Sequence, residues 1–194
     1  MKKRDLLARS AILGLLPTGS ALAAGKSRTG PTLLTLSGAL GRSNRGPFDP
    51  ALDQMMAKHG VQFDRAFAFD APALQRLAPV SIRPTLEYDA RVHTLTGPLL
   101  ATVLEAAGVG PGRAIQLGLR AVDGYNVALS LADARSYRMI VATHIDGRPL
   151  GLGGLGPQWA LLDADRVAPF KDKPLKDRFP LCPWGLYHVD VKEA

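Results

Sequence analysis

The sequence lacks several residue types and motifs that mark common kinds of chemistry. Its only cysteine, Cys182, excludes an intramolecular disulfide framework, a zinc ribbon and an iron–sulfur cluster held by the chain's own thiolates alone. The signatures of serine hydrolases (G-x-S-x-G), zinc proteases (H-E-x-x-H), P-loop proteins and EF-hands are also absent. These absences remove the usual motif-based assignments, so function has to be inferred from weaker patterns.

Long apolar runs and clusters of one charge are lacking as well. An apolar stretch at residues 11–22 is interrupted by Pro17 and Gly19 and is shorter than the roughly 20 residues of a membrane-spanning helix. No later segment is apolar enough to span. The basic residues at 171–178 are interleaved with aspartates, whereas a phosphate-tracking face needs uncompensated positive charge. We therefore predict neither an integral membrane protein nor a nucleic-acid-binding protein.

The N-terminal residues have the features of an export signal. Four basic residues precede or flank the apolar stretch, and an A-x-A cleavage motif lies at 21–23. An amphipathic first helix is the alternative, but a small-residue cleavage pattern has no reason to follow a core helix. The Lys3-Arg4 pair resembles part of a twin-arginine signal, so the export route stays open. We predict a signal peptide at 1–23, a flexible leader at 24–31 and a folded domain at 32–194.

The rest of the chain predicts an α+β fold in a single domain, with a mixed β-sheet and flanking short helices. The 20 glycines and 15 prolines indicate many tight turns between short elements. Asp49-Pro50 and Asp70-Ala71-Pro72 predict helix starts at 49–58 and 70–77, and an apolar face with period near 3.6 predicts the clearest helix at 96–108. Apolar runs predict strands at 32–38, 114–119, 127–129, 139–142, 159–162 and 187–191, with Asp-Gly turns at 123–124 and 146–147.

Local patterns offer few residues for metal or phosphate chemistry. The glycine-rich segment 151–156 lacks the lysine and following helix of a phosphate-binding loop, which favours a flexible hairpin turn. The four histidines are too far apart for a local metal site, although His144 near Asp146 is the one most worth attention. Cys182 lies between Leu181 and Pro183, a setting typical of an inert thiol.

Five motifs occur in an order and spacing that resemble a known family. They are G-P-L-L-x-x-x-L-x-x-x-G at 97–108, the D-G-Y turn at 123–125, A-x-x-x-D-G-x-P-L at 142–150, G-P-x-W at 156–159, and a closing strand beginning W-x-L at 184–186. With these motifs the chain resembles the oxidoreductase molybdopterin-binding domain proteins of the sulfite-oxidase fold, specifically their short exported branch. The resemblance runs from residue 82 onward and implies that fold.

The chain departs from the enzymes of that family at one residue. The resemblance implies a cysteine ligand to molybdenum ahead of the G-P-L-L helix, but residues 77–95 contain no cysteine and Cys182 lies at the opposite end of the chain. Thiolate is the ligand that holds and tunes this metal. The resemblance therefore implies a pocket for the pterin part, with molybdopterin itself less expected and no metal site predicted.

A pterin is a flat, electron-poor bicycle with an amide edge. Its recognition requires an aromatic plane for stacking, carboxylates or carbonyls for its N–H donors, and an arginine or amide for its carbonyl oxygen. The tryptophans could instead be core aromatics, Tyr125 a turn residue and Arg83 a surface charge. The predicted ligand-binding residues are Trp159, Trp184, Tyr125, Arg83, Tyr88, Asp123, Asn126 and His144.

The sequence leaves three functional hypotheses. The first is an exported, periplasmic, non-catalytic pterin-binding protein; the resemblance implies that such proteins relay ligand state to the periplasmic domain of a membrane-bound cyclic-di-GMP enzyme. The second is a molybdopterin-dependent oxidoreductase with a non-cysteine ligand set, with His144 or Arg83 near the metal. The third is a haem protein with His144 or His188 and a methionine as axial ligands.

Overall fold

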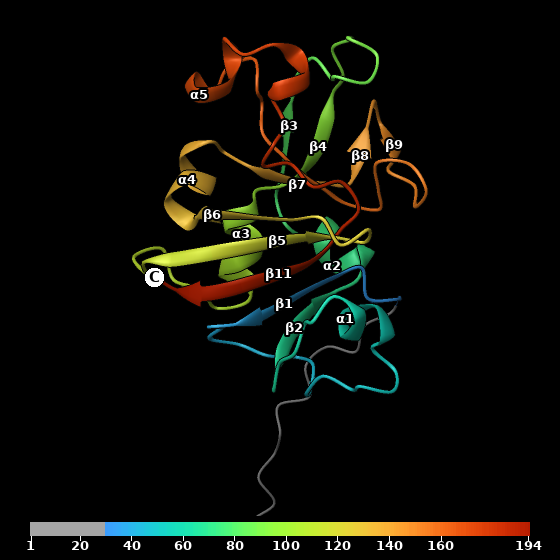
Figure 1. The fold of residues 1–194 in the computed structure, drawn as a ribbon, viewed down its shortest axis with the longest axis vertical. Coiled ribbons are helices and arrows are strands. Elements are labelled where there is room, and N and C mark those ends of the chain that lie inside the picture. The colour runs from blue at the N-terminus through green and yellow to red at the C-terminus, as the bar shows by residue number, and fades with distance from the viewer. Residues whose placement is uncertain (1–29) are drawn as a thin grey trace, which may run out of the picture.

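The computed structural model describes residues 30–194, which form a mixed α/β structure made mostly of strands with a few short helices (Figure 1). The predicted signal peptide at 1–23 and residues 24–29 of the predicted leader lie outside the described residues. Within residues 30–194, no helix is long and apolar enough to cross a membrane.

A five-stranded mixed sheet forms the larger layer. In spatial order its strands are β2 (Ala66–Phe69), β1 (Leu34–Gly38), β11 (Leu186–Glu193), β5 (Ile115–Ala121) and β6 (Asn126–Ser130). The first and last strands along the chain, β1 and β11, pair in parallel, with Leu36 opposite Val189, and the other pairs are antiparallel. The prediction of a mixed sheet is confirmed.

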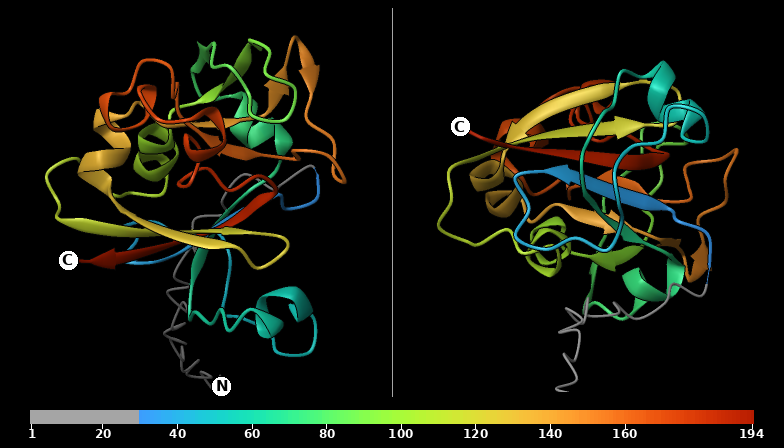
Figure 2. Two further views of the ribbon diagram at one scale, coloured as in Figure 1. Left: turned by 45° about the horizontal axis from the view of Figure 1, so that its top comes forward. Right: turned by 90° about the horizontal axis from the view of Figure 1, so that it is seen from below.

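A second layer covers one face of this sheet (Figure 2). It contains the pair β7 (Ile140–Ala142) and β10 (Trp159–Leu161), together with a sheet of β3 (Pro79–Ile82), β4 (Leu95–Pro98), β8 (His144–Ile145) and β9 (Arg148–Pro149). Alternate residues of the large sheet, such as Leu117, Leu119 and Val189, point into the interior and are almost fully buried. The main core lies between the two layers.

The helices are short. They are α1 (Gln54–Lys58), α2 (Ala71–Gln75), α3 (Leu100–Ala106), α4 (Leu131–Ser136) and α5 (Ala168–Lys171), followed by a 3-10 turn η1 (Leu175–Asp177). The Asp70 carboxylate caps α2 by accepting from the Ala73 N–H, as the Asp-Ala-Pro start signal indicates. The apolar face of α3 is buried through Leu100, Val103 and Leu104.

The start of α3 differs from the prediction. Residues 96–98 belong to strand β4, and the helix begins at Leu100. A Cβ atom at Gly97 would lie 1.9 Å from the Val141 carbonyl oxygen, so the glycine allows β4 to pack against β7. The Gly-Pro pair therefore marks a close strand contact before the helix and is not part of its first turn.

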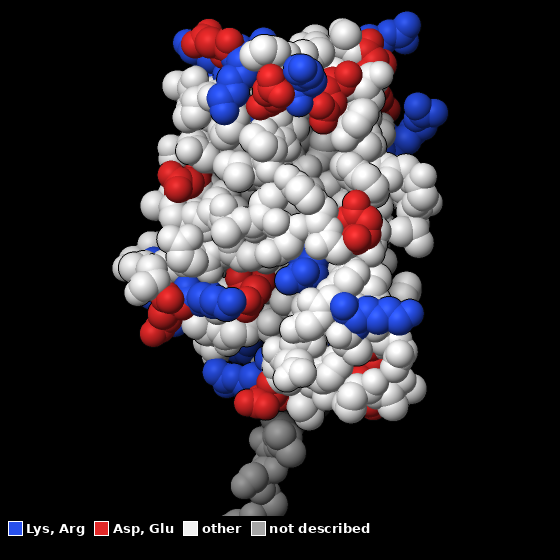
Figure 3. Space-filling model, in the orientation of Figure 1, with Lys and Arg blue, Asp and Glu red and all other residues white. Residues whose placement is uncertain are grey.

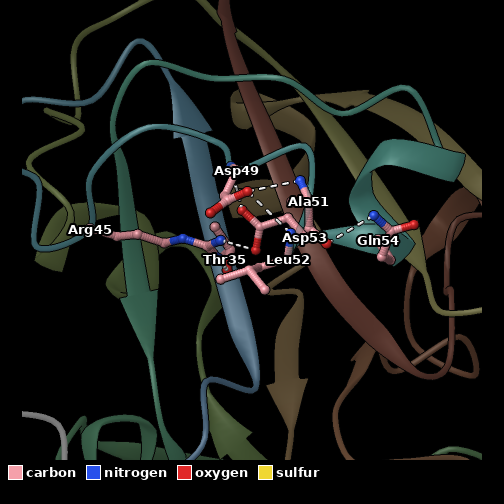
Figure 4. Close-up of polar contacts among 7 residues, drawn as sticks. All are labelled: Thr35, Arg45, Asp49, Ala51, Leu52, Asp53 and Gln54. Atoms are coloured by element: carbon pink, nitrogen blue, oxygen red, sulfur yellow. Dashed lines mark hydrogen bonds and ion pairs between the residues drawn. The ribbon is translucent and has the colours of Figure 1, made fainter.

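The predicted helix at 49–58 is reduced to its second half, α1 (Figure 4). The Asp49 carboxylate accepts from the Ala51 and Leu52 N–H groups and closes a turn, after which Asp53 precedes the helix. The Asp53 carboxylate also pairs with the Arg45 guanidinium, which reaches Thr35 Oγ1 on β1 at 3.4 Å. These contacts hold segment 42–65 against the face of the large sheet that is remote from the main core (Figure 2).

Candidate functional site

A cavity of 600 Å³ opens where three loops meet at one end of the large sheet. The loops are segment 83–94 between β3 and β4, the β5–β6 turn, and segment 172–185 between α5 and β11. The cavity-lining residues used below are Glu87, Tyr88, Asp123, Tyr125, Lys173, Lys176, Asp177, Phe179, Pro180, Cys182 and Trp184. Four of the eight predicted ligand-binding residues, Tyr88, Asp123, Tyr125 and Trp184, are thus brought together.

The β5–β6 turn holds Tyr125 over the cavity. The Asp123 carboxylate accepts from the Tyr125 N–H at 2.9 Å, and Gly124 has a φ of +91°, a conformation that favours glycine. At the far end of the side chain, the Tyr125 hydroxyl donates to the Pro180 carbonyl at 3.0 Å. The ring is therefore fixed at both ends while 50% of the residue stays exposed.

The two tryptophans have different positions. Trp159 is buried, and its indole N–H donates to the Cys182 carbonyl at 2.8 Å, so it supports the cavity from below and does not line it. A β-bridge joins Trp159 to Trp184, which does line the cavity. The Tyr88 ring lies 6.4 Å from Trp159, centroid to centroid, and the residue is 56% exposed. The cavity wall thus carries aromatic rings on a rigid base.

Burial and neighbouring charge alter the acidity of two groups at the cavity. Burial raises the pKa of Tyr88, the Glu87 carboxylate raises it further, and the Trp184 indole N–H partly opposes both. Burial raises the pKa of the Cys182 thiol to about 12, so this group stays protonated at neutral pH. The cavity therefore offers hydroxyl and carboxylate groups but no thiolate.

Asp165 connects two walls of the cavity and was not found from the sequence. One carboxylate oxygen accepts from the Thr85 N–H at 2.7 Å and from the Thr85 hydroxyl at 2.8 Å, and the other pairs with Arg178 at 2.7 Å. The Arg178 Nε in turn donates to the Lys173 carbonyl at 2.8 Å. Nothing in the spacing of these residues indicates that they meet.

A histidine anchors the loop that carries Tyr88. His93 Nδ1 lies 2.7 Å from the Asp146 carboxylate, and its Nε2 lies 2.9 Å from that of Asp89. The hydrogen bond to Asp146, followed by that to Asp89, raises the pKa of His93 above its usual value. Because Asp146 lies in the β8–β9 turn, the contact joins the β3–β4 loop to the other end of the same sheet.

The other four predicted site residues do not line the cavity. Trp159 lies beneath it, and Arg83 is an exposed residue at the end of β3 whose backbone N–H faces Asp163. Asn126 is exposed on β6, opposite Arg120. His144 lines a separate cavity of 310 Å³ and lies 2.9 Å from Thr143 Oγ1. The family resemblance and the chemistry of the side chains grouped these residues, but the fold separates them.

The donor set does not fit molybdenum or another protein-held metal ion. Within residues 30–194, no group of three or more His, Cys, Asp or Glu side chains is arranged to hold a metal. The thiol at the cavity, Cys182, is buried and belongs to no such group, and the two residues expected near a metal, His144 and Arg83, lie elsewhere. We therefore derive no chemistry through a metal at this site.

A buried serine–histidine pair lies away from the cavity and does not fit nucleophilic catalysis. Ser37 Oγ and His188 Nε2 are 2.9 Å apart, and both residues are almost completely buried. Burial lowers the pKa of His188 to about 4, and its Nδ1 has no hydrogen-bond partner in the described part of the chain. A general base requires substrate access and a pKa near the working pH. The same pair leaves no free Nε2 for a haem iron.

The surface charge is mixed. In the view of Figure 3, Lys and Arg side chains are interspersed with Asp and Glu side chains, including at the end of the molecule that carries α5. No protein-family model matches the chain, and a search of the curated proteins finds no match either. Function is therefore inferred from the cavity and its residues.

Proposed function

We propose that this protein is an exported, periplasmic, non-catalytic pterin-binding protein that uses the sulfite-oxidase fold. One observation carries the proposal: the cavity of 600 Å³ gathers four aromatic side chains, Tyr88, Tyr125, Phe179 and Trp184, next to carboxylates. Its volume lies in the range typical of small-molecule sites, about 300–1,000 Å³. The five motifs at 97–186 support the choice of fold and ligand class.

The chemistry of the lining residues suits a pterin. A flat, electron-poor ring gains from stacking on tyrosine or indole. Glu87, Asp123 and Asp177 supply carboxylate acceptors for the N–H groups of the pyrimidine edge, and the cationic lysines suit its carbonyl oxygen. Because no group of metal-holding side chains lies within residues 30–194, these features favour binding over metal-based redox chemistry.

The direct test is titration of the purified protein with oxidised pterin and with tetrahydropterin, followed by calorimetry and by pterin fluorescence. We expect Trp184→Leu to weaken binding by about tenfold or more, since one aromatic stacking contact is worth about 0.5–1.5 kcal/mol beyond its buried area. His144→Ala is the matched control, because His144 lines a different cavity. Failure of both pterins to bind the unmodified protein would refute the proposal.

We also propose that the periplasmic domain of a membrane-bound cyclic-di-GMP enzyme reads the ligand state. The support for this step is the family resemblance of the motifs at 97–186. The expected result is that such a domain, purified from the same source, binds the pterin-loaded and the pterin-free protein with different affinities. Equal affinities would contradict the relay and leave the pterin site intact.

A further inference from the structure

We propose that the free edge of strand β3 and the groove beside it bind an extended, acidic segment of a partner protein. This site is separate from the pterin cavity and does not depend on it. The groove has a volume of 460 Å³ and lies between β3, the end of α4 and the segment leading into α5. The residues used in the argument are Ser81, Ile82, Arg138, Asp163 and Arg166.

The hydrogen-bond register shows which polar groups of β3 are open. β3 is the outermost strand of its sheet. The carbonyls of Thr94 and Thr96 accept from N–H groups on the opposite side, Asp146 at 2.8 Å and Thr143 at 2.9 Å. Antiparallel strands alternate the direction of their polar groups. The Ser81 N–H and C=O, opposite Thr96, therefore point away from β4.

The next outward-facing amide along this edge is already engaged. The Arg83 N–H lies 3.4 Å from the Asp163 carboxylate, and Arg166 Nε lies 3.6 Å from the same oxygen. The other oxygen of Asp163 is buried and has no hydrogen-bond partner within residues 30–194. An incoming strand would pair with the open N–H and C=O of Ser81, beside this carboxylate.

The charge of the groove selects an acidic occupant. Arg138 and Arg166 line the groove, and the exposed Arg83 lies at its end, whereas Asp163 is the acidic residue in the lining. No side-chain hydrogen bond or ion pair engages Arg138 within the described residues. Carboxylates of an extended segment would meet these guanidinium groups, which bind carboxylates in paired geometry.

The backbone at Arg138 adds an independent reason. This residue follows the end of α4 with a φ of +49°, in the left-handed region where helix ends usually carry glycine. A strained non-glycine residue that persists at a binding groove points to use of its side chain. Here the strained residue, Arg138, is one of those that line the groove beside β3.

The edge suits a short foreign segment better than a second copy of the chain. β3 has four residues and begins with Pro79, and both features limit edge-to-edge pairing of long strands. The groove fits a partner segment that adds a few residues beside β3 and whose carboxylates pair with the arginines of the groove. Dimerisation through β3 would overturn the assignment and is measured by sedimentation of the protein alone.

The experiment uses two blocked, fluorescent ten-residue peptides, one alternating Val and Glu and the other alternating Val and Lys. We expect the Val-Glu peptide to bind the protein and to protect the Ser81 amide from hydrogen exchange. The binding should weaken as the salt concentration rises. The Val-Lys peptide is expected not to bind. Absence of Val-Glu binding, or equal binding of both peptides, would overturn the proposal.

Two variants locate the site without relying on loss of fold. Arg138→Gly removes the guanidinium and relieves the left-handed strain, so the protein should keep or gain stability while the Val-Glu peptide binds about fivefold more weakly. Ser81→Pro blocks the outward N–H and should also weaken binding. Arg148→Gly is the control, since Arg148 lies on β9 at the opposite edge of the same sheet. Unchanged affinity in Arg138→Gly and Ser81→Pro would overturn the proposal.

Discussion

Polar side chains gather in two regions that differ in their access to water. Behind the large sheet, Ser37 and His188 are buried and bonded to each other. At the cavity, Tyr88 and Tyr125 stay half-exposed, and in the loop that carries Tyr88, His93 bridges two partly exposed carboxylates. Burial lowers the pKa of His188, whereas hydrogen bonds to Asp146 and Asp89 raise that of His93. One region therefore uses its polar atoms for folding, and the other keeps them available for a ligand.

Acid is expected to break the buried region first. The folded-state pKa of His188 is about 4, below the roughly 6.5 of an unfolded chain, so the unfolded state takes up the proton first as pH falls. The contribution of neutral, buried His188 to the free energy of unfolding is complete above about pH 6.5. It decreases toward pH 4 by on the order of 3 kcal/mol. Urea unfolding between pH 7.5 and 4 measures this loss.

His188→Gln separates this effect from general acid denaturation. The variant should be less stable at pH 7 but should lose little further stability between pH 6.5 and 4. The lowered pKa of Asp53 acts in a different window, because stability that depends on its carboxylate is lost only as pH falls below about 4. A variant with the same pH slope as the unmodified protein would show that His188 is not the cause.

Substitution of Arg45 is expected to have the next largest effect on the free energy of unfolding. Its guanidinium pairs with Asp53 and lies 5.1 Å from the centre of the Phe63 ring, and about four-fifths of each charged side chain is buried. Burial opposes ionisation of Asp53, but the Asp49 N–H and Arg45 outweigh it and lower the pKa. Arg45→Met should cost about 2 kcal/mol, between the values for exposed and fully buried pairs.

The control for Arg45 is a matched substitution at an exposed arginine. Arg148→Met removes the same side chain on β9 and should change the free energy of unfolding by less than about 0.5 kcal/mol. Chemical denaturation at pH 7 compares the two variants. If both lose the same stability, the Arg45 contacts in Figure 4 contribute nothing specific.

Removal of the Ser37 hydroxyl tests the buried pair more gently. Ser37→Ala leaves the His188 Nε2 buried without a partner and should cost about 1 kcal/mol. Ser43→Ala, at an exposed position in the loop after β1, should be nearly neutral. Equal stability of both variants would mean that the Ser37–His188 hydrogen bond offers no advantage over water.

Much of the five-stranded sheet was predictable from the sequence, but the sheet of β3, β4, β8 and β9 was not. The strands predicted from the apolar runs at 114–119 and 187–191 are confirmed as β5 and β11. The Asp-Gly turns also lie where they were predicted. Strands β8 and β9 have two residues each, too few to show an alternating pattern. Helix α4 was missed because its Ser130 cap follows strand β6 without an intervening loop.

The cavity was only partly predictable for a similar reason. Asp123 and Tyr125 belong to a turn motif that is visible in the sequence, and Trp184 opens the last strand segment. Lys173 and Asp165 come from an irregular segment whose path depends on long-range contacts, such as the one from Asp165 to Thr85. Local spacing carries no information on such contacts.

The smallest expected effect is that of His93, in the loop that carries Tyr88, on pterin affinity. It separates the behaviour of His93 from that of His188. The carboxylates on its two ring nitrogens raise the pKa of His93, so the stability that its protonated form contributes is complete below about pH 6.5 and is lost as pH rises through the raised folded-state pKa. The charged groups that act on the imidazole are Asp89 and Asp146, and these carboxylates are in turn influenced by Arg91 and Arg148. When the His93 imidazolium loses a proton, one of its two N–H groups can no longer donate to a carboxylate, and the loop that carries Tyr88 is held less firmly.

We expect pterin affinity to fall about twofold to threefold between pH 6 and pH 9, with little change in overall stability, because the ion pairs are partly exposed. His93→Gln keeps a hydrogen-bonding side chain but cannot be charged, so its pterin affinity should not show this pH dependence. The imidazole resonances of His93 and His188 should titrate on opposite sides of the ordinary histidine pKa. If both titrate together, the contrast between a buried folding region and an open binding region fails at its clearest point.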